Sequence, residues 1–449
     1  MKFKQLLVLA WPLILSNSFT TIQVTIDRIY LSRYSPESLA AATSGLMIFW
    51  TPFILLQCTA SYVSTFVAQY QGTQKTDRIG AILWQAIYFC FLSGCLFLFL
   101  LPISRKIVAL TGHSSSIQLL EEQYFYCLCW MALPNLLVAT VSGFFSGLEK
   151  TKVILWMNGV GLVANSVIGL CWIFGYAGFP RAGIEGAGWA LVASSWISAL
   201  VAIGLVFQPS ITKAYAIWEQ YRFDWNLFFR LIRYGSPAGL QWLIDCLAFT
   251  LFLLLAEWFS TEALIATSIA YAINSVFYVP LIGLGQAVSI LVGNNLGKNK
   301  PEQASCSAIL GLRLALVYMA VFAIILIFFP KMFISVFTVD DNPLSFDQLD
   351  EIKNILIFVA LYSLFDAVAT ILGFTLRGAG DTLFVSFVAC SLAWLVMVVP
   401  TYYLWKYNGE FLWAWAFASL YIALQAIFFG IRFRGGKWKS MRVIEPVLD

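Results

Sequence analysis

The sequence predicts an all-α polytopic membrane protein with twelve transmembrane helices, arranged as two six-helix bundles related by a pseudo-twofold axis along the membrane normal. Three observations predict this fold. Hydrophobic residues make up 60% of the 449 residues and charged residues only 11%, a balance foreign to soluble domains. Twelve apolar runs are long enough to cross a bilayer. The second half of the chain also repeats the first at a fixed offset.

The twelve apolar runs are separated by charged turns or by turns rich in glycine and proline. Each meets the length of about 20 residues that a helix needs to cross the hydrocarbon core. The predicted spans are residues 5–32, 38–70, 80–103, 119–147, 153–177, 185–208, 229–258, 263–296, 304–330, 352–376, 383–405 and 411–431.

Lysine and arginine are unevenly divided between the loops on the two sides of the membrane. The side that carries both termini has eighteen of the 27, whereas the other side has seven. Loops rich in positive charge are retained in the cytoplasm. Both termini are therefore expected to be cytoplasmic.

The repeat appears when residues 35–81 are compared with residues 260–306 at an offset of 225. Chance alignment of apolar segments explains poorly why polar and glycine positions match as well. The matches include Glu37 with Glu262, Ser64 with Ser289, Gly72 with Gly297 and Lys75 with Lys300. Later, Gly147 and Thr151 in SGLEKT match Gly378 and Thr382 in RGAGDT.

Each half has an even number of spans, so the two repeats share one orientation, which implies an axis along the membrane normal and a cavity between two lobes. We predict an N-lobe at residues 1–210 with helices 1–6. A cytoplasmic inter-lobe linker follows at 211–228. The C-lobe, residues 229–449, holds helices 7–12 and a short basic cytoplasmic tail.

Three aspartates lie within the predicted spans: Asp27 in the first, Asp245 in the seventh and Asp366 in the tenth. An ionised side chain near the bilayer centre costs on the order of a few kcal/mol or more, so each is a functional candidate. A carboxyl shielded from water either carries a proton or joins other oxygen ligands around Na⁺. The alternative for each is an interhelical hydrogen bond or ion pair.

Uncharged polar residues within the spans supply further contacts, either between helices or towards a cavity. We predict that five of them support the cation or substrate site. They are Asn17, Asn165, Gln241, Asn274 and Gln286.

Several function classes lack the residues they need. No P-loop, HExxH or GxSxG pattern occurs at a credible position, so we expect no enzyme, no catalytic residue and no organic cofactor. The nine cysteines form no CxxC pair and lie in or beside apolar segments, as small core residues do. The single histidine, His113, lies in a polar turn and is expected to be solvated. The net charge is +4, and the basic residues form no dense run with interleaved recognition residues. This argues against a nucleic-acid partner.

Specific strings give the chain a family resemblance. It resembles the multidrug and toxic compound extrusion (MATE) transporters, most closely the bacterial NorM-like branch, over nearly its whole length. The strings that carry the resemblance are WPLILSNSFTTIQVTIDRIYLSRYSPESLAA, FVAQYQGTQK, GLEKTK, GSPAGLQWLID, AVSILVGNNLGKNK and LFDAVATILGFTLRGAGDT. The resemblance implies a MATE/MOP-type fold in the bacterial cytoplasmic (inner) membrane.

The resemblance also assigns roles by position. Asp27 matches the family's acidic residue of helix 1 and Asp366 that of helix 10, whereas Asp245 stands where NorM-like members have glutamate in helix 7. Asn165 matches an asparagine of the N-lobe cation site, but Gly169 replaces an aspartate of archaeal members one turn later. This departure favours the C-lobe pair as the main cation site, with Na⁺, if it is the coupling ion, at Asp366 and Asp245.

The resemblance implies an antiporter that couples Na⁺ or H⁺ entry to export of amphipathic, often cationic organic compounds by alternating access. The expected partners are a small-molecule substrate and membrane lipid, and the chain is expected to be monomeric. One alternative is a flippase or exporter of a lipid-linked or polar metabolite precursor in the same superfamily, which needs a cationic cavity. Another is a non-transporting membrane receptor or scaffold, which has no need of the intramembrane acids.

Overall fold

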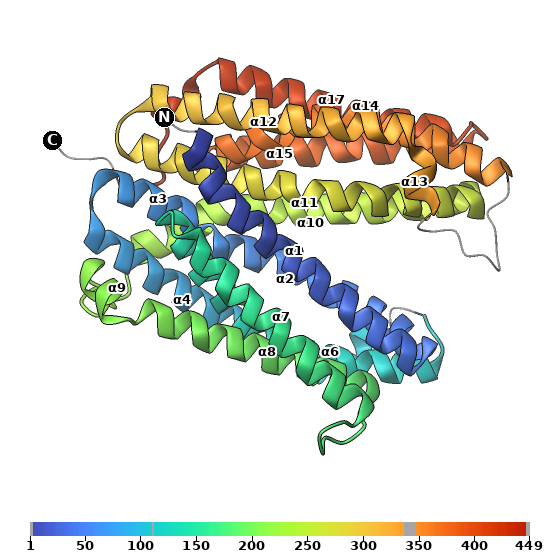
Figure 1. Ribbon diagram of the computed structural model, residues 1–449, viewed down its shortest axis with the longest axis horizontal. Helices are drawn as coiled ribbons and strands as arrows, with labels where there is room; N and C mark the ends of the chain where they lie inside the picture. Colours follow the sequence, from blue (N-terminus) through green and yellow to red (C-terminus); the bar gives the residue numbers. More distant parts are fainter. Residues whose placement is uncertain (1–2, 110–111, 336–345, 446–449) are drawn as a thin grey trace. The chain divides into compact units, whose positions relative to one another are not determined.

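Helices dominate the computed structural model, which describes residues 3–109, 112–335 and 346–445 (Figure 1). The α-helices are α1 (Phe3–Tyr34), α2 (Pro36–Ser61), α3 (Val63–Thr73), α4 (Thr76–Leu98), α5 (Ser104–Ala109), α6 (Ser115–Gly147), α7 (Thr151–Phe174), α8 (Gly183–Val206), α9 (Pro209–Ala214), α10 (Trp225–Phe259), α11 (Thr261–Gly297), α12 (Pro301–Phe328), α13 (Pro330–Ile334), α14 (Phe346–Ala379), α15 (Thr382–Leu392), α16 (Val399–Lys406) and α17 (Leu412–Arg434). Short 3₁₀ or π segments are η1 (Leu101–Ile103), η3 (Ala393–Val398) and η4 (Lys437–Ser440).

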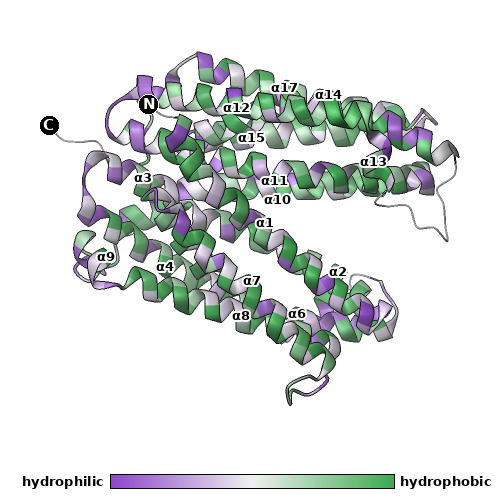
Figure 2. Ribbon diagram, in the orientation of Figure 1, coloured by the Kyte–Doolittle hydropathy of each residue, from purple (hydrophilic) through white to green (hydrophobic). Residues whose placement is uncertain are grey.

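The predicted number of membrane spans is confirmed. Twelve helical stretches in the described part of the chain are long and apolar enough to cross a bilayer. Figure 2 shows hydrophobic residues along the middle of these helices and hydrophilic ones gathered towards their ends and turns. The all-α fold class follows directly from this pattern, because in lipid a helix satisfies its backbone donors and acceptors within one segment.

Local chemistry sets where the long helices begin. At the start of α2, Ser35 is extended and its hydroxyl accepts the backbone N–H of Ser38 at 3.0 Å. Pro36 follows at the first helical position, where no backbone donor is needed.

The eleventh span is irregular near Pro400. Proline removes a backbone donor, and the π-helical segment η3 lies just before it, as expected where the regular ladder of backbone hydrogen bonds is broken.

Equivalent turns in the two halves have the same backbone geometry. Gln74 has φ of 60° and Asn299, at the offset of 225, has φ of 56°. In each turn the N–H of the next residue bonds back five positions, from Lys75 to the Tyr70 carbonyl at 3.2 Å and from Lys300 to the Asn295 carbonyl at 2.9 Å. The sequence repeat is therefore a repeat of structure, in which two non-glycine residues adopt the left-handed region.

Two matched glycines hold the same pair of helices together in each half. A Cβ on Gly147 of α6 would lie 2.7 Å from the carbonyl oxygen of Ser64 in α3. A Cβ on Gly378 of α14 would lie 2.6 Å from the carbonyl oxygen of Ser289 in α11. Ser64 and Ser289 are themselves matched at offset 225. Absence of a side chain at these glycines lets the backbones approach, as is common between membrane helices.

The chain divides into two compact units. The C unit comprises Met1–Ile14, Leu240–Leu296 and Lys300–Arg442, and the N unit comprises Leu15–Gly239, Gly297–Asn299 and Val443–Asp449. Each unit therefore includes a few residues from the other half of the sequence. The units are defined by contacts and the predicted lobes by spans, so the lobe boundaries at 210 and 229 stay predictions.

Each unit is built around one central helix. In the N unit, α6 packs against α2, α3, α4 and α8, and α7 packs against α8. In the C unit, α14 packs against α12, α15 and α17, beside which it runs in Figure 1. These central helices are the fourth and tenth spans, which are equivalent positions in the repeat.

The polar stretch 211–228 is folded against the N unit. It contains part of α9 and the start of α10, and Ile217 is fully buried. Trp84 of α4 donates its indole N–H to the Ile217 carbonyl at 2.7 Å, and Gln85 donates to the Arg222 carbonyl at 3.1 Å. The segment is thus held by side chains of the third span, which composition alone does not reveal.

The described part of the basic tail after α17, residues 435–445, is held by specific contacts. Trp438 is fully buried, stacks on Phe433 and donates its indole N–H to the Phe433 carbonyl at 2.9 Å. In the N unit, the backbone N–H of Val443 bonds the side chain of Gln69 at 2.9 Å, and Glu445 pairs with Arg78. The tail therefore contains buried apolar anchors among its charges.

The glycine contact predicts a position-specific effect of one methyl group. We expect Gly378→Ala to lower the free energy of unfolding by about 1–3 kcal/mol, because the added Cβ overlaps the Ser289 backbone and overpacking costs this much. Gly430→Ala in α17 is the matched control, since a Cβ there meets nothing within 4 Å. Unfolding of both purified variants in detergent checks this, and equal stability of the two would contradict it.

Candidate functional site

In the N unit, the carboxylate of Asp27 is enclosed between helices. Asp27 on α1 is buried, and Asn165 on α7 is fully buried beside it. The amide nitrogen of Asn165 donates to Oδ1 of Asp27 at 2.7 Å, and its oxygen accepts the hydroxyl of Ser194 from α8 at 3.3 Å. An ionised carboxylate only accepts hydrogen bonds, so the contact with Asp27 fixes which way the amide points, and the amide oxygen is left to accept the Ser194 hydroxyl.

Gly169 lies on the same side of α7 as Asn165, one turn further along. A Cβ at this glycine would lie 3.9 Å from Oδ1 of Asp27 and 3.8 Å from the ring of Tyr30. The position that the family resemblance marks as a departure is therefore adjacent to the carboxylate. Asp27 has an amide partner here, and the neighbouring turn contributes no second acid.

In the C unit, three side chains from two helices form a connected series. Gln241 and Asp245 are one turn apart on α10, and the amide nitrogen of Gln241 donates to Oδ2 of Asp245 at 3.3 Å. Arg377, in the last turn of α14, donates from Nη2 to the amide oxygen of Gln241 at 2.7 Å. Oδ1 of Asp245 is buried and has no hydrogen-bond partner within the described residues.

Asp366 belongs to the same neighbourhood. It lies on α14 and accepts the hydroxyl of Thr370 at 3.3 Å, one turn along the helix. Two tyrosines, Tyr278 on α11 and Tyr421 on α17, lie within electrostatic range of both Asp245 and Asp366. Four helices of one unit thus bring two carboxylates, two phenols and a guanidinium together.

The other three predicted polar residues lie on α11 and α1. Asn274 on α11 has a buried side-chain oxygen without a hydrogen-bond partner in the described part of the chain. Gln286, also on α11, is partly buried. Asn17 on α1 belongs to the N unit, is partly buried, and its backbone carbonyl accepts the hydroxyl of Thr21 at 3.4 Å. The functional roles of all three stay predictions.

Sequence reasoning missed two charged residues. Arg377 lies just beyond the predicted tenth span, which ends at residue 376, whereas α14 continues to Ala379. Glu121 on α6 is fully buried, accepts the hydroxyl of Ser44 and lies 2.6 Å from Nδ1 of His113. His113 itself is half-exposed, as expected for a residue in a turn, although its ring contacts this buried acid. The sequence feature that could have identified Arg377 and Glu121 is the position of each charge close to the boundary of a predicted span.

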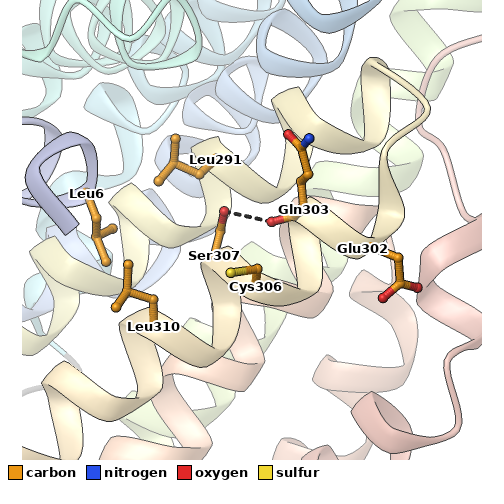
Figure 3. A pocket seen from close by; sticks show the side chains of 7 residues that line it. All are labelled: Leu6, Leu291, Glu302, Gln303, Cys306, Ser307 and Leu310. Atoms are coloured by element: carbon orange, nitrogen blue, oxygen red, sulfur yellow. Dashed lines mark hydrogen bonds between the residues drawn. The ribbon is translucent and has the colours of Figure 1, made fainter. Parts of the chain in front are cut away.

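A separate hollow lies in the C unit and is not lined by Asp245 or Asp366. It has a volume of about 270 Å³ and is lined by Leu6, Leu291, Glu302, Gln303, Cys306, Ser307 and Leu310. Figure 3 shows the leucines of α1, α11 and α12 around one side and Glu302 at the edge, with the hydroxyl of Ser307 bonded to the Gln303 carbonyl. None of the predicted site residues is among those that line it.

The donor set suits a hard monovalent cation or a proton better than a transition metal. Within residues 3–109, 112–335 and 346–445, no group of three or more His, Cys, Asp or Glu side chains is placed to hold a metal ion. Asp245 and Asn274 instead offer buried oxygens, and oxygen ligands suit hard cations. The assignment of Na⁺ to Asp366 and Asp245 stays a prediction.

Comparison with known proteins gives a consistent family match. The MatE family model matches residues 12–171 and 237–403. The chain is 27% identical over 391 residues to the probable multidrug resistance protein NorM of Mesorhizobium japonicum, covering 84% of this chain and 81% of that protein. It is likewise 27% identical over 395 residues to the NorM protein of Rhizobium meliloti, covering 88% and 82%.

Among solved structures, the chain resembles a crystal structure of MATE in complex with MaL6. The TM-score is 0.87, with 98% of this chain and 97% of the other covered and 17% of residues identical. At this identity the likeness concerns the fold alone, and it agrees with the predicted fold class.

The Asp27 contact generates a testable prediction. We expect Asn165→Ala to lower the free energy of unfolding by about 1–3 kcal/mol, because it removes the donor to a buried carboxyl. Ser166→Ala is the matched control, since that hydroxyl bonds only the Leu162 carbonyl of its own helix among the contacts observed, and we expect a change below about 0.5 kcal/mol.

Thermal and denaturant unfolding of the purified variants measures both effects. Adding Asp27→Asn to each variant tests the partnership, because two residues in direct contact give non-additive effects. Additive losses would show that Asn165 stabilises the protein without acting on Asp27.

Proposed function

The chain belongs to the MatE family, whose model covers more than half of its 449 residues, and from this membership we propose that it is a cation-coupled multidrug antiporter. In this proposal Na⁺ or H⁺ enters the cell while an amphipathic, often cationic compound leaves by alternating access. The relatives named as multidrug resistance proteins support the substrate class. The protein moves its substrate without making or breaking bonds in it.

One observation carries the ion-coupling part of the proposal. Oδ1 of Asp245 is buried without a hydrogen-bond partner in the described residues, in a unit that also encloses Asp366. A buried acceptor without a partner is costly, and a proton or Na⁺ removes that cost. Asp366 and Asp245 are therefore the proposed cation ligands, with Asp27 assisting from the N unit.

Coupling requires that the ion and the substrate bind the two conformations with different affinities. Competition of both for the same carboxylates provides that difference. The concentration gradient of the ion drives the exchange. When the substrate is a monovalent cation, a one-for-one exchange moves no net charge; when the substrate is neutral, the entering charge adds about 2.3 kcal/mol for each 100 mV of membrane potential. Binding of the cation then favours the conformation that has released the substrate.

An aromatic pair next to Asp245 supports a cationic substrate. Phe249 follows Asp245 by one turn of α10, so the two side chains share a face of the helix. Its ring stacks on Tyr271 of α11, with centroids 4.2 Å apart. A carboxylate beside aromatic faces attracts an organic cation through charge and cation–π contacts.

The chain is a multi-pass membrane protein, which we place in the bacterial cytoplasmic membrane as a monomer surrounded by lipid, with both termini in the cytoplasm. Flippase activity on a lipid-linked precursor is the rival within the superfamily, and the intramembrane acids argue against an anionic headgroup.

Replacing one carboxylate tests the mechanism. We expect Asp366→Asn to abolish resistance to cationic drugs in cells and to reduce gradient-driven efflux of ethidium from proteoliposomes at least about tenfold, because an amide carries no titratable charge. Asp350→Asn on the same helix is the control, since Asp350 is exposed and pairs only with Lys353 among the contacts observed. Full protection by Asp366→Asn at normal expression would contradict the carboxylate mechanism.

The same proteoliposomes identify the coupling ion. We expect an imposed inward gradient of either Na⁺ or H⁺, but not of K⁺, to drive ethidium efflux by the wild-type protein. If neither gradient drives efflux, the antiporter proposal is wrong.

The orientation is tested separately with reporter fusions. Green fluorescent protein fused after Asp449 is expected to fluoresce, and alkaline phosphatase at this position to be inactive, because eighteen lysines and arginines lie on the side of the termini and positive loops stay inside. Fusion after Asn408 is expected to give the opposite pair of results. Active phosphatase at the C-terminus would contradict the orientation.

A further inference from the structure

Arg377 is held in a fixed place at the end of α14. Its neighbour Gly378 packs on the Ser289 backbone of α11. Phe374, one turn earlier, fills the space at Gly285, where a Cβ would lie 3.0 Å from the Phe374 Cγ. The guanidinium carbon of Arg377 lies 5.4 Å from the centroid of the Phe374 ring. Packing against α11 on both sides therefore fixes the direction in which Arg377 reaches α10.

Arg377 determines the orientation of the Gln241 amide. A guanidinium only donates hydrogen bonds and a carboxylate only accepts them. Gln241 lies between the two, with its oxygen 2.7 Å from Nη2 of Arg377 and its nitrogen 3.3 Å from Oδ2 of Asp245. A flipped amide would face a donor with its NH₂ group and an acceptor with its oxygen. Only one orientation satisfies both neighbours.

We propose that Arg377 is a positioning residue of the coupling-ion site: through Gln241 it occupies Oδ2 of Asp245 with a donor and leaves Oδ1 to receive the cation. The inference rests on the proposed function and adds to it a residue outside the carboxylates. The guanidinium also lies within electrostatic range of Asp245. A positive charge near the carboxylate repels the cation and so weakens its binding.

We call the series of contacts from Arg377 through Gln241 to Asp245 the relay. The matched positions in the first half of the chain do not repeat it. At the offset of 225, Gln241 corresponds to Ser16, and at the offset of 231 that relates Gly147 to Gly378, Arg377 corresponds to Ser146. Asp366 corresponds to Asn135 at this second offset. The backbone frame is shared by the two halves, but the positions that carry the relay are uncharged in the first.

The test replaces Arg377 and measures ion binding directly. In Arg377→Met the charge is removed at similar volume, and we expect the half-saturating concentration of the coupling ion to fall about fivefold, a usual size for coupling between two sites. Arg377→Lys keeps the charge and is expected to stay within about twofold of the wild type. The ion dependence is read from thermal unfolding of the full-length protein in NaCl and pH titrations.

Two further measurements separate positioning from a general structural role. Ethidium efflux gives the substrate KM, which we expect to change less than the ion dependence in Arg377→Met. Arg432→Met is the control in the same unit, because Arg432 pairs with Asp381 at 2.6 Å and its loss is expected to lower stability without changing the ion dependence. In an Asp245→Asn background, Arg377→Met is expected to have no further effect on the ion dependence.

The outcomes distinguish the inference from the proposed function. If the wild type responds to neither ion gradient, the proposed function fails. If the wild type is ion-driven but the ion dependence is the same in Arg377→Met, or changes equally with and without Asp245, the positioning role is wrong. Should Arg377→Met not fold, the comparison is made with Arg377→Gln, which also removes the charge.

Discussion

A carboxyl group enclosed by apolar helices loses the hydrogen bonds of water and must replace them with those of its neighbours. The two units meet this constraint differently. Asp27 has a close amide donor in Asn165, which is itself held by Ser194. Asp245 has a longer bond to Gln241 on one oxygen and no partner on the other within the described residues. In the proposed function, the ion therefore binds mainly where this constraint is incompletely met.

The frame around these acids is duplicated more faithfully than the acids themselves. Gly147 and Gly378 bring equivalent helices together, and Gln74 and Asn299 form equivalent turns. These contacts involve backbone atoms and do not depend on the polar side chains nearby. The two halves can therefore differ in their polar residues without a change in how the helices pack. One has Asp366 and Arg377 where the other has Asn135 and Ser146.

Much of the candidate site was predictable because charge is rare in this chain. Asp27, Asp245 and Asp366 stand out in apolar spans, and Gln241 and Asn165 stand out as uncharged polar residues in the seventh and fifth spans. Arg377 and Glu121 did not stand out, since each lies within a few residues of a predicted span boundary. A charge there is equally consistent with solvent and with burial, and only the direction of the side chain distinguishes the two.

The sequence by itself determined the twelve helices, the repeat and the three acids, because hydropathy, charge and matched residues are properties of the chain in order. Only the tertiary structure decided which polar groups meet. The contacts from Asn165 to Asp27 and from Arg377 to Gln241 each join residues more than 130 positions apart. Such pairs depend on helix packing, in which a rotation of one helix by a single residue, about 100°, directs a side chain elsewhere.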